Sequence, residues 1–437
     1  MGLLTYRKIE KDFPGGLYLP LLDQPVPLKI INPGILSSLL ALPLRIGDGS
    51  IMRPVVAQDE IVKAGQLLAQ SGDGYYIYSP CDAQVKSQSE AFVEYRPGQP
   101  VLQLQCISEE IQGCTCPEFS LERFSQKQNE MMLNVVDRSG IVNPTDGQPL
   151  SRLLRKLKNQ NVTHVIANAT GLEPDLVASL VVLDKFPEQV FTAQAILRQW
   201  LNASEAIMAY PYHFEIDRNA AETWNVKCVP VSEKYPQGRD ALILKTLHNS
   251  GNINNKIGIG AVFDIQMLRQ LERLILAGQL PYDRIVTVCG DGVKKPGHYQ
   301  VPVGTGVKDL INYAQVEKNI SCVAAQSTLA GYAIDPETAV ITTRSQAIIV
   351  LADKPVRQVG TCIRCGRCIE NCPVGIDPMR IHSLAENEKY DQAVKIGVAK
   401  CIECGTCSYV CPASLPLDER IRLVKCKKNI QSSRCCQ

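Results

Sequence analysis

Two short stretches near the carboxyl end concentrate cysteine at a spacing that suits metal–thiolate chemistry. CIRCGRCIENCP (362–373) and CIECGTCSYVCP (401–412) repeat at an offset of 39 residues and match at seven of twelve positions, four of which are cysteine. A C-x-x-C-x-x-C segment supplies three thiolates around a cubane iron–sulfur cluster, and the fourth must come from elsewhere in the chain. The repeat therefore predicts two [4Fe-4S] clusters.

In two-cluster proteins the fourth cysteine of each run ligates the other cluster. This exchange assigns one site to Cys362, Cys365, Cys368 and Cys411, and the second site to Cys401, Cys404, Cys407 and Cys372. Gly366 and Gly405 follow the second ligand of each run, where we expect the backbone to turn tightly around a cluster. Pro373 and Pro412 follow the fourth cysteine, and we expect each to begin the helix that leaves its site.

A pair of structural zinc sites is the alternative, because C-x-x-C also builds zinc ribbons. The spacing favours iron, because zinc has no use for the third cysteine of each run or for the Cys-Pro that follows. The remaining cysteines form no comparable pattern, and we expect most of them to be packed or free thiols. They are Cys81, Cys106, Cys114, Cys116, Cys228, Cys289, Cys322, Cys426, Cys435 and Cys436. The pairs 114/116 and 435/436 could also bind metal or oxidise.

Composition excludes several other classes of protein. The 437 residues carry a formal charge of +2, with 46 Lys+Arg against 44 Asp+Glu, so binding of nucleic acid is not expected to be the main task. The longest uncharged apolar stretch, 30–44, is interrupted by proline and glycine and cannot span a bilayer. The first residues lack the pattern of a secretory signal, so we expect a reducing cytoplasm.

The chain reads as a multidomain α/β and α+β protein. Residues 1–114 are β-rich and resemble the barrel-sandwich (biotinyl/lipoyl-like) domains, but the expected hairpin tip at 71–74 has no lysine for a carrier arm. Residues 115–282 alternate strands and helices, as in a Rossmann-like α/β layer. Asp264 is placed to cap a helix that Gly278 ends.

Two further regions complete this division. Residues 283–352 predict a small β-grasp-like (SLBB) module, and 353–437 an α-helical dicluster ferredoxin-type domain with a basic tail. The last basic residues predict either a solvated helix end or a surface for anionic lipid or an acidic partner. They include Arg420, Arg422, Lys425, Lys427, Lys428 and Arg434.

The order of these parts resembles the C subunits of the Rnf ion-translocating electron transport complexes. The similarity includes FPGGLYLP (13–20), KAGQLLAQ (63–70), EKYPQGRDALI (233–243), the stretch 276–311 and both cysteine runs. The resemblance implies a peripheral protein on the cytoplasmic face of the cell membrane. It also implies an α/β layer similar to the subunit of respiratory complex I that binds FMN and NADH.

The sequence departs from this family where the family binds flavin. The family's loop has the form G-x-G-G-A-x-F-P-T, whereas this chain has SGIVNPTDGQPLSRLL (139–154). The positions in question are Asn143, Pro144, Asp146 and Gly147. Proline offers no N–H, and a carboxylate repels phosphate. The family's acidic segment N-x-x-E-x-E-P survives only as Asn168, Glu173 and Pro174. We therefore expect the FMN and NADH site to be lost, and we assign no catalytic residue.

The resemblance implies an iron–sulfur subunit that relays single electrons through its two clusters. The electrons would pass between ferredoxin-side subunits and NADH or another redox partner such as a cytochrome. The implied partners are the other subunits of the membrane complex, with no nucleic acid. A soluble flavin- and iron–sulfur-containing enzyme similar to cobalamin reductase is the alternative, and the altered loop counts against it.

Overall fold

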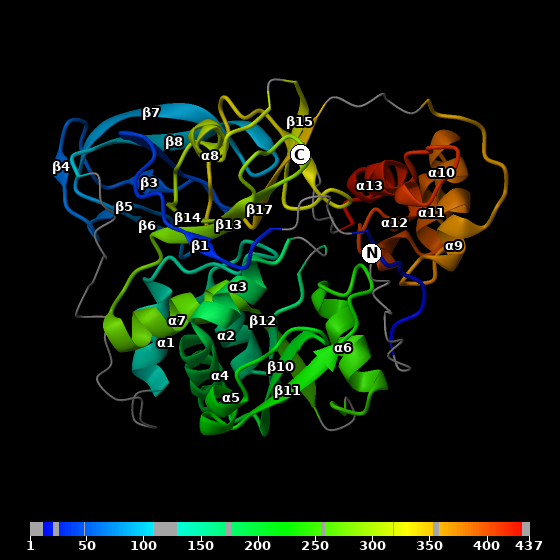
Figure 1. Cartoon of the computed structure of the whole chain (residues 1–437), viewed down its shortest axis with the longest axis horizontal. Coiled ribbons are helices and arrows are strands. Elements are labelled where there is room, and N and C mark those ends of the chain that lie inside the picture. Colours follow the sequence, from blue (N-terminus) through cyan, green and yellow to red (C-terminus); the bar gives the residue numbers. More distant parts are fainter. Residues whose placement is uncertain are drawn as a thin grey trace.

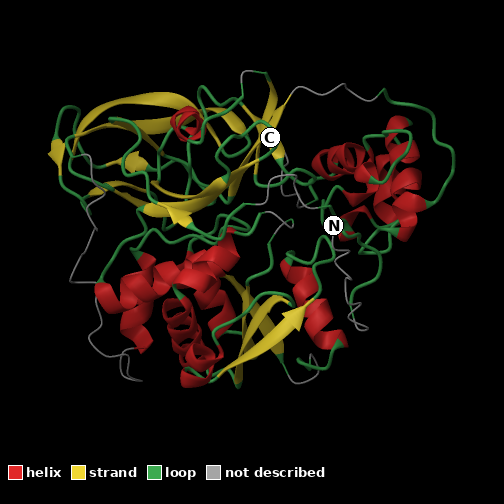
Figure 2. Cartoon of the chain, viewed as in Figure 1, coloured by secondary structure: helices red, strands yellow, loops and turns green. Residues whose placement is uncertain are grey.

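The computed structural model describes residues 12–20, 26–47, 49–108, 129–171, 173, 176–254, 258–317, 319–352 and 358–430, with only the backbone of 129–131. The β-rich parts lie together on one side of the molecule, the α/β layer lies beneath them, and the cysteine runs occupy a separate helical module (Figures 1 and 2). No helix in these ranges is both long enough and apolar enough to cross a membrane.

Two antiparallel sheets enclose the first hydrophobic core, with strand orders β2-β8-β7-β4 and β3-β5-β6. Their strands are β2 (Leu39–Pro43), β3 (Arg53–Pro54), β4 (Ile61–Val62), β5 (Leu67–Gln70), β6 (Tyr76–Tyr78), β7 (Ala83–Val93) and β8 (Arg96–Cys106). Leu40, Val62, Leu68 and Leu104 are fully buried between the sheets. Residues 71–74 connect β5 to β6, so the predicted hairpin tip is confirmed.

The α/β layer has a parallel sheet of order β11-β10-β9-β12. These strands are β9 (Val162–Asn168), β10 (Glu205–Pro211), β11 (Val226–Val231) and β12 (Ile259–Asp264). Helices cover both faces, which is why the strands are apolar almost throughout. One face carries α1 (Asn129–Asp137), α2 (Leu150–Lys158), α3 (Ala178–Lys185), α4 (Pro187–Leu201), α5 (Arg218–Thr223) and α7 (Ile265–Ala277), and the other carries α6 (Asp240–Asn249).

The predicted caps of α7 are confirmed. The Asp264 carboxylate accepts a hydrogen bond from the N–H of Met267, and Gly278 ends the helix in the left-handed conformation.

A mixed sheet of order β1-β14-β13-β17-β15-β16 joins the two regions. It contains β1 (Ile30–Ile31), β13 (Asp283–Cys289), β14 (Gly297–Pro302), β15 (Ile320–Ala325), β16 (Tyr332–Ile334) and β17 (Ala347–Ala352), with α8 (Val307–Tyr313) packed on it. β1 comes from the amino-terminal segment and pairs in parallel with β14. The first part of the chain therefore completes a sheet whose other strands lie more than 250 residues later.

The last module is helical and has a small core of its own. It comprises α9 (Arg367–Glu370), α10 (Pro378–Glu386), α11 (Tyr390–Lys395), a 3-10 turn (Val398–Lys400), α12 (Thr406–Tyr409) and α13 (Leu417–Lys427). Ile381, Ala393, Val398, Ile421 and Val424 are buried at its centre.

The expectation that Pro373 and Pro412 begin helices is wrong. Each lies in a turn, and left-handed residues follow at Gly375 and Ser414. The helix after the first run begins instead at Pro378, where the Asp377 carboxylate accepts a hydrogen bond from the N–H of Arg380.

Candidate metal centre

The two cysteine runs share one backbone conformation. Arg364 and Glu403, each two residues after the first cysteine of its run, have φ angles of 57° and 54°. Gly366 and Gly405 have φ angles of 76° and 73° and immediately precede α9 and α12. The expected tight turn at each glycine is confirmed, and the sequence repeat is also a structural repeat.

These left-handed positions bring main-chain amides to the cysteine sulfurs. The N–H of Arg364 donates to Sγ of Cys362 at 3.4 Å, and the N–H of Glu403 donates to Sγ of Cys401 at 3.3 Å. A hydrogen bond to sulfur favours the thiolate over the thiol, and it helps to set the potential of a cluster bound there. The thiol donors and these amides together fit an iron–sulfur cluster.

Burial distinguishes the two runs. Cys365 is exposed, whereas Cys404 is only 8% exposed. Burial raises the pKa of Cys401 to about 12, and it also raises the pKa of the Cys407 thiol. Because cluster ligands are thiolates, a cluster held by these groups would release their protons on binding.

Cys372 of the first run lies in the neighbourhood of the second. Burial is the main cause of the raised pKa of Cys404, and the charge of Cys372 raises it further. Cys372 and Cys401 also pack against the same hydrophobic cluster. Among the residues that the structure describes, no group of three or more His, Cys, Asp or Glu side chains is arranged to hold a single metal ion.

Cys411 of the second run lies beside the first. It lines a hollow of about 730 Å³ together with Arg367 and Asn371. Ile363 and Ile369, also in the first run, are 68% and 45% exposed, and Tyr409 near Cys411 is 47% exposed. The first run therefore faces solvent with a partly apolar surface.

The second run is held against the rest of the molecule. The Tyr235 hydroxyl donates a hydrogen bond to the carbonyl oxygen of Cys404. Gly405 packs so closely on the carbonyl of Leu329 that a Cβ there would clash. The first run has a contact of its own with the amino-terminal segment, because the N–H of Gly16 donates to the carbonyl of Asn371 at 2.9 Å.

A buried ion pair supports the second run from α13. Lys425 Nζ lies 2.8 Å from Glu403 Oε1 and donates to the carbonyl of Cys401 at 2.7 Å, and both charged side chains are 4% exposed. Lys425 is therefore not part of a solvated basic surface, because it compensates a carboxylate inside the module. Arg434 lies outside the described residues.

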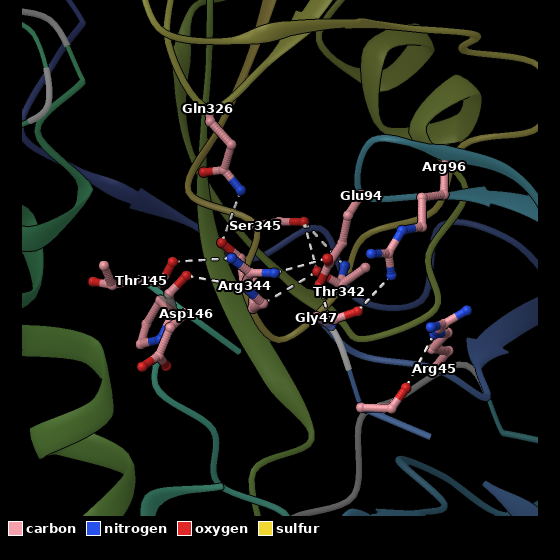
Figure 3. A network of polar contacts seen from close by, with 12 residues as sticks. Arg45, Gly47, Glu94, Arg96, Thr145, Asp146, Gln326, Thr342, Arg344 and Ser345 are labelled. Carbon is pink, nitrogen blue, oxygen red and sulfur yellow. Dashed lines mark hydrogen bonds and ion pairs between the residues drawn. The ribbon is translucent and has the colours of Figure 1, made fainter. Parts of the chain in front are cut away.

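The altered flavin loop is tied to itself and to a distant arginine (Figure 3). The N–H groups of Thr145 and Gln148 donate to the side chains of Asn143 and Asp146, and the N–H of Gly147 donates to the carbonyl of Asn143. These amides are therefore committed within the loop.

The side chain of Arg344 also holds this loop. Its guanidinium donates to the carbonyls of Pro144 and Thr145, and it pairs with the carboxylate of Glu94 at 2.7 Å. Glu94 is 6% exposed and Arg344 15%. The loop thus presents carbonyl oxygens to a cation, whereas an FMN phosphate requires free amide donors. The residues present do not fit FMN.

The surviving acidic-segment residues have structural partners. The Glu173 carboxylate accepts hydrogen bonds from the main chain of Thr328 and Leu329 and from the hydroxyls of Ser327 and Thr328. Asn168 donates to the carbonyl of Gly238 and to Asp240. Pro174 lies outside the described residues, as do Cys114, Cys116, Cys435 and Cys436.

A cavity of about 120 Å³ lies beside the altered loop, where Pro144 and Thr145 line it. Its lining includes Glu94, Thr145, Arg239, Asp240, Ser327 and Arg344. Both signs of charge line it, and burial raises the pKa of Asp240 to about 6. Its volume is well below the several hundred cubic ångströms of an ordinary cofactor pocket.

The fold and the paired cysteine runs define a modular iron–sulfur protein. Residues 354–412 match the family described as a 4Fe-4S dicluster domain, and residues 285–314 match the SLBB domain. The dicluster and SLBB components of the predicted multidomain fold are confirmed.

Two curated relatives are similar to this chain over most of its length. The chain is 25% identical over 416 residues to the C subunit of the ion-translocating oxidoreductase complex of Rhodobacter capsulatus, covering 91% of this chain and 79% of that protein. It is 24% identical to the C subunit of the proton-translocating ferredoxin:NAD(+) oxidoreductase complex of Clostridium ljungdahlii. This match covers 88% of this chain and 86% of that protein. The resemblance to the C subunits of such complexes is confirmed.

One solved structure gives a weaker similarity. It is the NAD+-reducing [NiFe]-hydrogenase in the air-oxidised state, at a TM-score of 0.47 and 14% identity, covering 68% of this chain and 61% of that one.

The sequence did not reveal several residues that shape the site. Tyr235 and Arg239 fall in the segment 233–243 that carries part of the family resemblance, but nothing in that segment indicates a contact with the cysteine module. Arg344 and Glu94 are separated by 250 residues, and neither belongs to a motif. Their roles depend on long-range packing.

Proposed function

We propose that this protein is the iron–sulfur electron-transfer subunit of an Rnf-type ion-translocating oxidoreductase complex. The observation that carries the proposal is the duplicated cysteine run, repeated in backbone conformation and in amide-to-sulfur hydrogen bonds. Relationship to the C subunits of such complexes over about nine-tenths of the chain supports it. The other subunits of such a complex are the proposed partners, at the cytoplasmic face of the membrane.

Two [4Fe-4S] clusters are proposed, with exchanged fourth ligands. The outer site is formed by Cys362, Cys365, Cys368 and Cys411, and the inner site by Cys401, Cys404, Cys407 and Cys372. When bound, the clusters supply one-electron transfer. The neighbourhood of Cys372 and Cys404, and the hollow shared by Cys411 and Arg367, support this exchange.

The two sites would have different tasks. The outer run is exposed and rimmed by Ile363, Ile369 and Tyr409, so it is suited to exchange electrons with another protein. The inner run is shielded by Tyr235 and Leu329 and is suited to receive electrons through this polypeptide. A ferredoxin-type protein or a cytochrome is the proposed external partner.

We propose further that FMN and NADH are not bound by this chain. The loop at 143–148 is closed by its own hydrogen bonds. Arg344 donates hydrogen bonds to its carbonyl oxygens at Pro144 and Thr145. This misfit also counts against a cobalamin reductase-like flavoenzyme. Without flavin, the proposed redox partner of this chain is another protein.

The decisive experiment is the iron, acid-labile sulfide, zinc and flavin content of anaerobically purified protein. We expect about eight iron and eight sulfide per chain, as two cubanes require, with no flavin after acid release. Zinc in place of iron and sulfide would overturn the electron-transfer proposal. Stoichiometric FMN with intact clusters would overturn only the proposal about the loop.

A further inference from the structure

Two cysteines outside the metal runs lie with their sulfur atoms in contact. Sγ of Cys81 is 3.3 Å from Sγ of Cys106, although the two residues are 25 positions apart. Cys106 ends β8, and Cys81 lies two residues before β7. The sequence placed both among the packed or free thiols, and the pairing arises from the β7–β8 hairpin.

The backbone on both sides of this pair is held in place. Cys106 is paired in register with Ala83, and its N–H donates to the carbonyl of Ser38 at 2.7 Å. The Ser79 hydroxyl donates to the carbonyl of Cys81 at 2.6 Å, and the N–H of Ile107 donates to the carbonyl of Asp82. A disulfide requires sulfur atoms about 2.05 Å apart. The two sulfurs therefore need to approach by little more than about 1 Å, which side-chain rotation can supply.

The two thiols differ in exposure and reactivity. Cys81 is completely buried, whereas Cys106 is half-buried. The hydrogen bond from the Cys81 thiol lowers the pKa of Cys106, which increases its thiolate fraction. An accessible nucleophilic thiol beside a buried second thiol is the arrangement found in reversible cysteine oxidation.

We infer that Cys81 and Cys106 form a dithiol site that a low-molecular-weight disulfide oxidises to an intramolecular disulfide. This inference does not depend on the proposed electron-transfer function. It concerns the β-rich part of the chain, which shares no ligand with the cysteine runs.

The chemistry balances with oxidised glutathione as the two-electron oxidant. The Cys106 thiolate attacks one sulfur of the oxidant, the S–S bond breaks, and one glutathione thiolate leaves. The Cys81 sulfur, after losing its proton, then attacks Sγ of Cys106, and the second glutathione thiolate leaves. Cys81 and Cys106 are oxidised to the disulfide, and the oxidant is reduced to two glutathione molecules that take up the two protons.

The experiment treats the anaerobic, cluster-containing full chain with oxidised glutathione, blocks remaining thiols by alkylation and maps the peptides by mass spectrometry. We expect a linked peptide joining Cys81 to Cys106, the loss of alkylation at these two positions, and its recovery on reduction. Visible absorbance and iron content are followed in the same sample. The absence of this linkage while the clusters remain intact would overturn the inference.

Variants identify the partners. Cys81→Ala and Cys106→Ser should each abolish the intramolecular linkage, and Cys81→Ala should stop at a glutathione adduct on Cys106. The matched control is Cys289→Ser, a buried cysteine in another sheet, which should form the Cys81–Cys106 linkage as the native chain does. Mapping of the native chain decides the question even if a variant fails to fold. Linkage to a cysteine other than Cys81 would also refute the pairing.

Discussion

Arg364 and Glu403 occupy the same position in the two cysteine runs but have opposite surroundings. Their φ angles differ by only 3° and both amides donate to a cysteine sulfur. Arg364 is exposed, whereas Glu403 is buried and paired with Lys425. The same local conformation therefore lies at the surface in one run and in the interior in the other. Because solvent exposure and nearby charge tune cluster potentials, we expect the two sites to differ in potential.

The first prediction concerns the buried pair. Lys425→Met leaves the Glu403 carboxylate without its cation and the Cys401 carbonyl without its donor, so we expect a loss of about 3–5 kcal/mol in the free energy of unfolding. Anaerobic urea unfolding, followed by cluster absorbance, measures this loss. Lys308→Met is the control, because its pair with Glu337 is about half exposed and should contribute little to stability. Equal losses would contradict a special role for Lys425.

The second prediction tests the exchanged ligands. Cys372→Ser and Cys404→Ser should perturb the same EPR signal, although they lie in different runs, and Cys411→Ser and Cys365→Ser should perturb the other. Each change should reduce the iron content from about eight to about four per chain or shift one signal only. If Cys372→Ser instead alters the signal affected by Cys365→Ser, each run supplies all four ligands of its own cluster.

The third prediction is a pH dependence at Asp240. Burial raises its pKa from 3.8 to about 6 in the folded state, so the folded protein binds the proton more tightly than the unfolded chain. Its contribution to stability is thus fully present below pH 4 and is lost as the pH rises through 6. Asp240→Asn removes the titrating carboxyl and with it this pH dependence of stability. The substitution should raise the free energy of unfolding by about 3 kcal/mol at pH 8 and by roughly half as much at pH 5.

Unfolding midpoints at several pH values measure this difference. Asp391→Asn serves as the control, because the Asp391 side chain is 82% exposed and its surface pair with Lys428 should contribute less than about 1 kcal/mol. A gain at Asp240 that is the same at pH 5 and pH 8 would show that its charge is not the cause.

The fourth prediction concerns Arg344. Arg344→Met removes the donors to the carbonyls of Pro144 and Thr145 and leaves Glu94 buried without a partner. We expect hydrogen exchange at 143–148 to become faster, by an amount equivalent to about 1–3 kcal/mol of local stability. Lys63→Met, which breaks an exposed pair with Asp82, should leave exchange in this loop unchanged. Unaltered exchange in Arg344→Met would mean that the loop holds itself closed.

The sequence by itself determined the local features of this protein. The tight turns of the two cysteine runs depend only on neighbouring residues and on left-handed φ angles. The sequence therefore specified both turns through the four spaced cysteines, the glycine after the second of them and the 39-residue repeat. The caps at Asp264 and Gly278 were equally local. The expectation for Pro373 failed because the next helix starts where Asp377 and Pro378 provide a better first turn.

Tertiary structure decided what surrounds these local features. Only packing places Lys425 inside the module, joins Arg344 to Glu94 across 250 residues, and brings Cys81 to Cys106. It also buries Cys404 of one cysteine run beside Tyr235 and leaves Cys365 of the other run exposed. Burial and charge compensation set the thiol pKa values and decide whether the altered loop fits FMN. Both depend on residues that are distant in the chain. No local spacing encodes them.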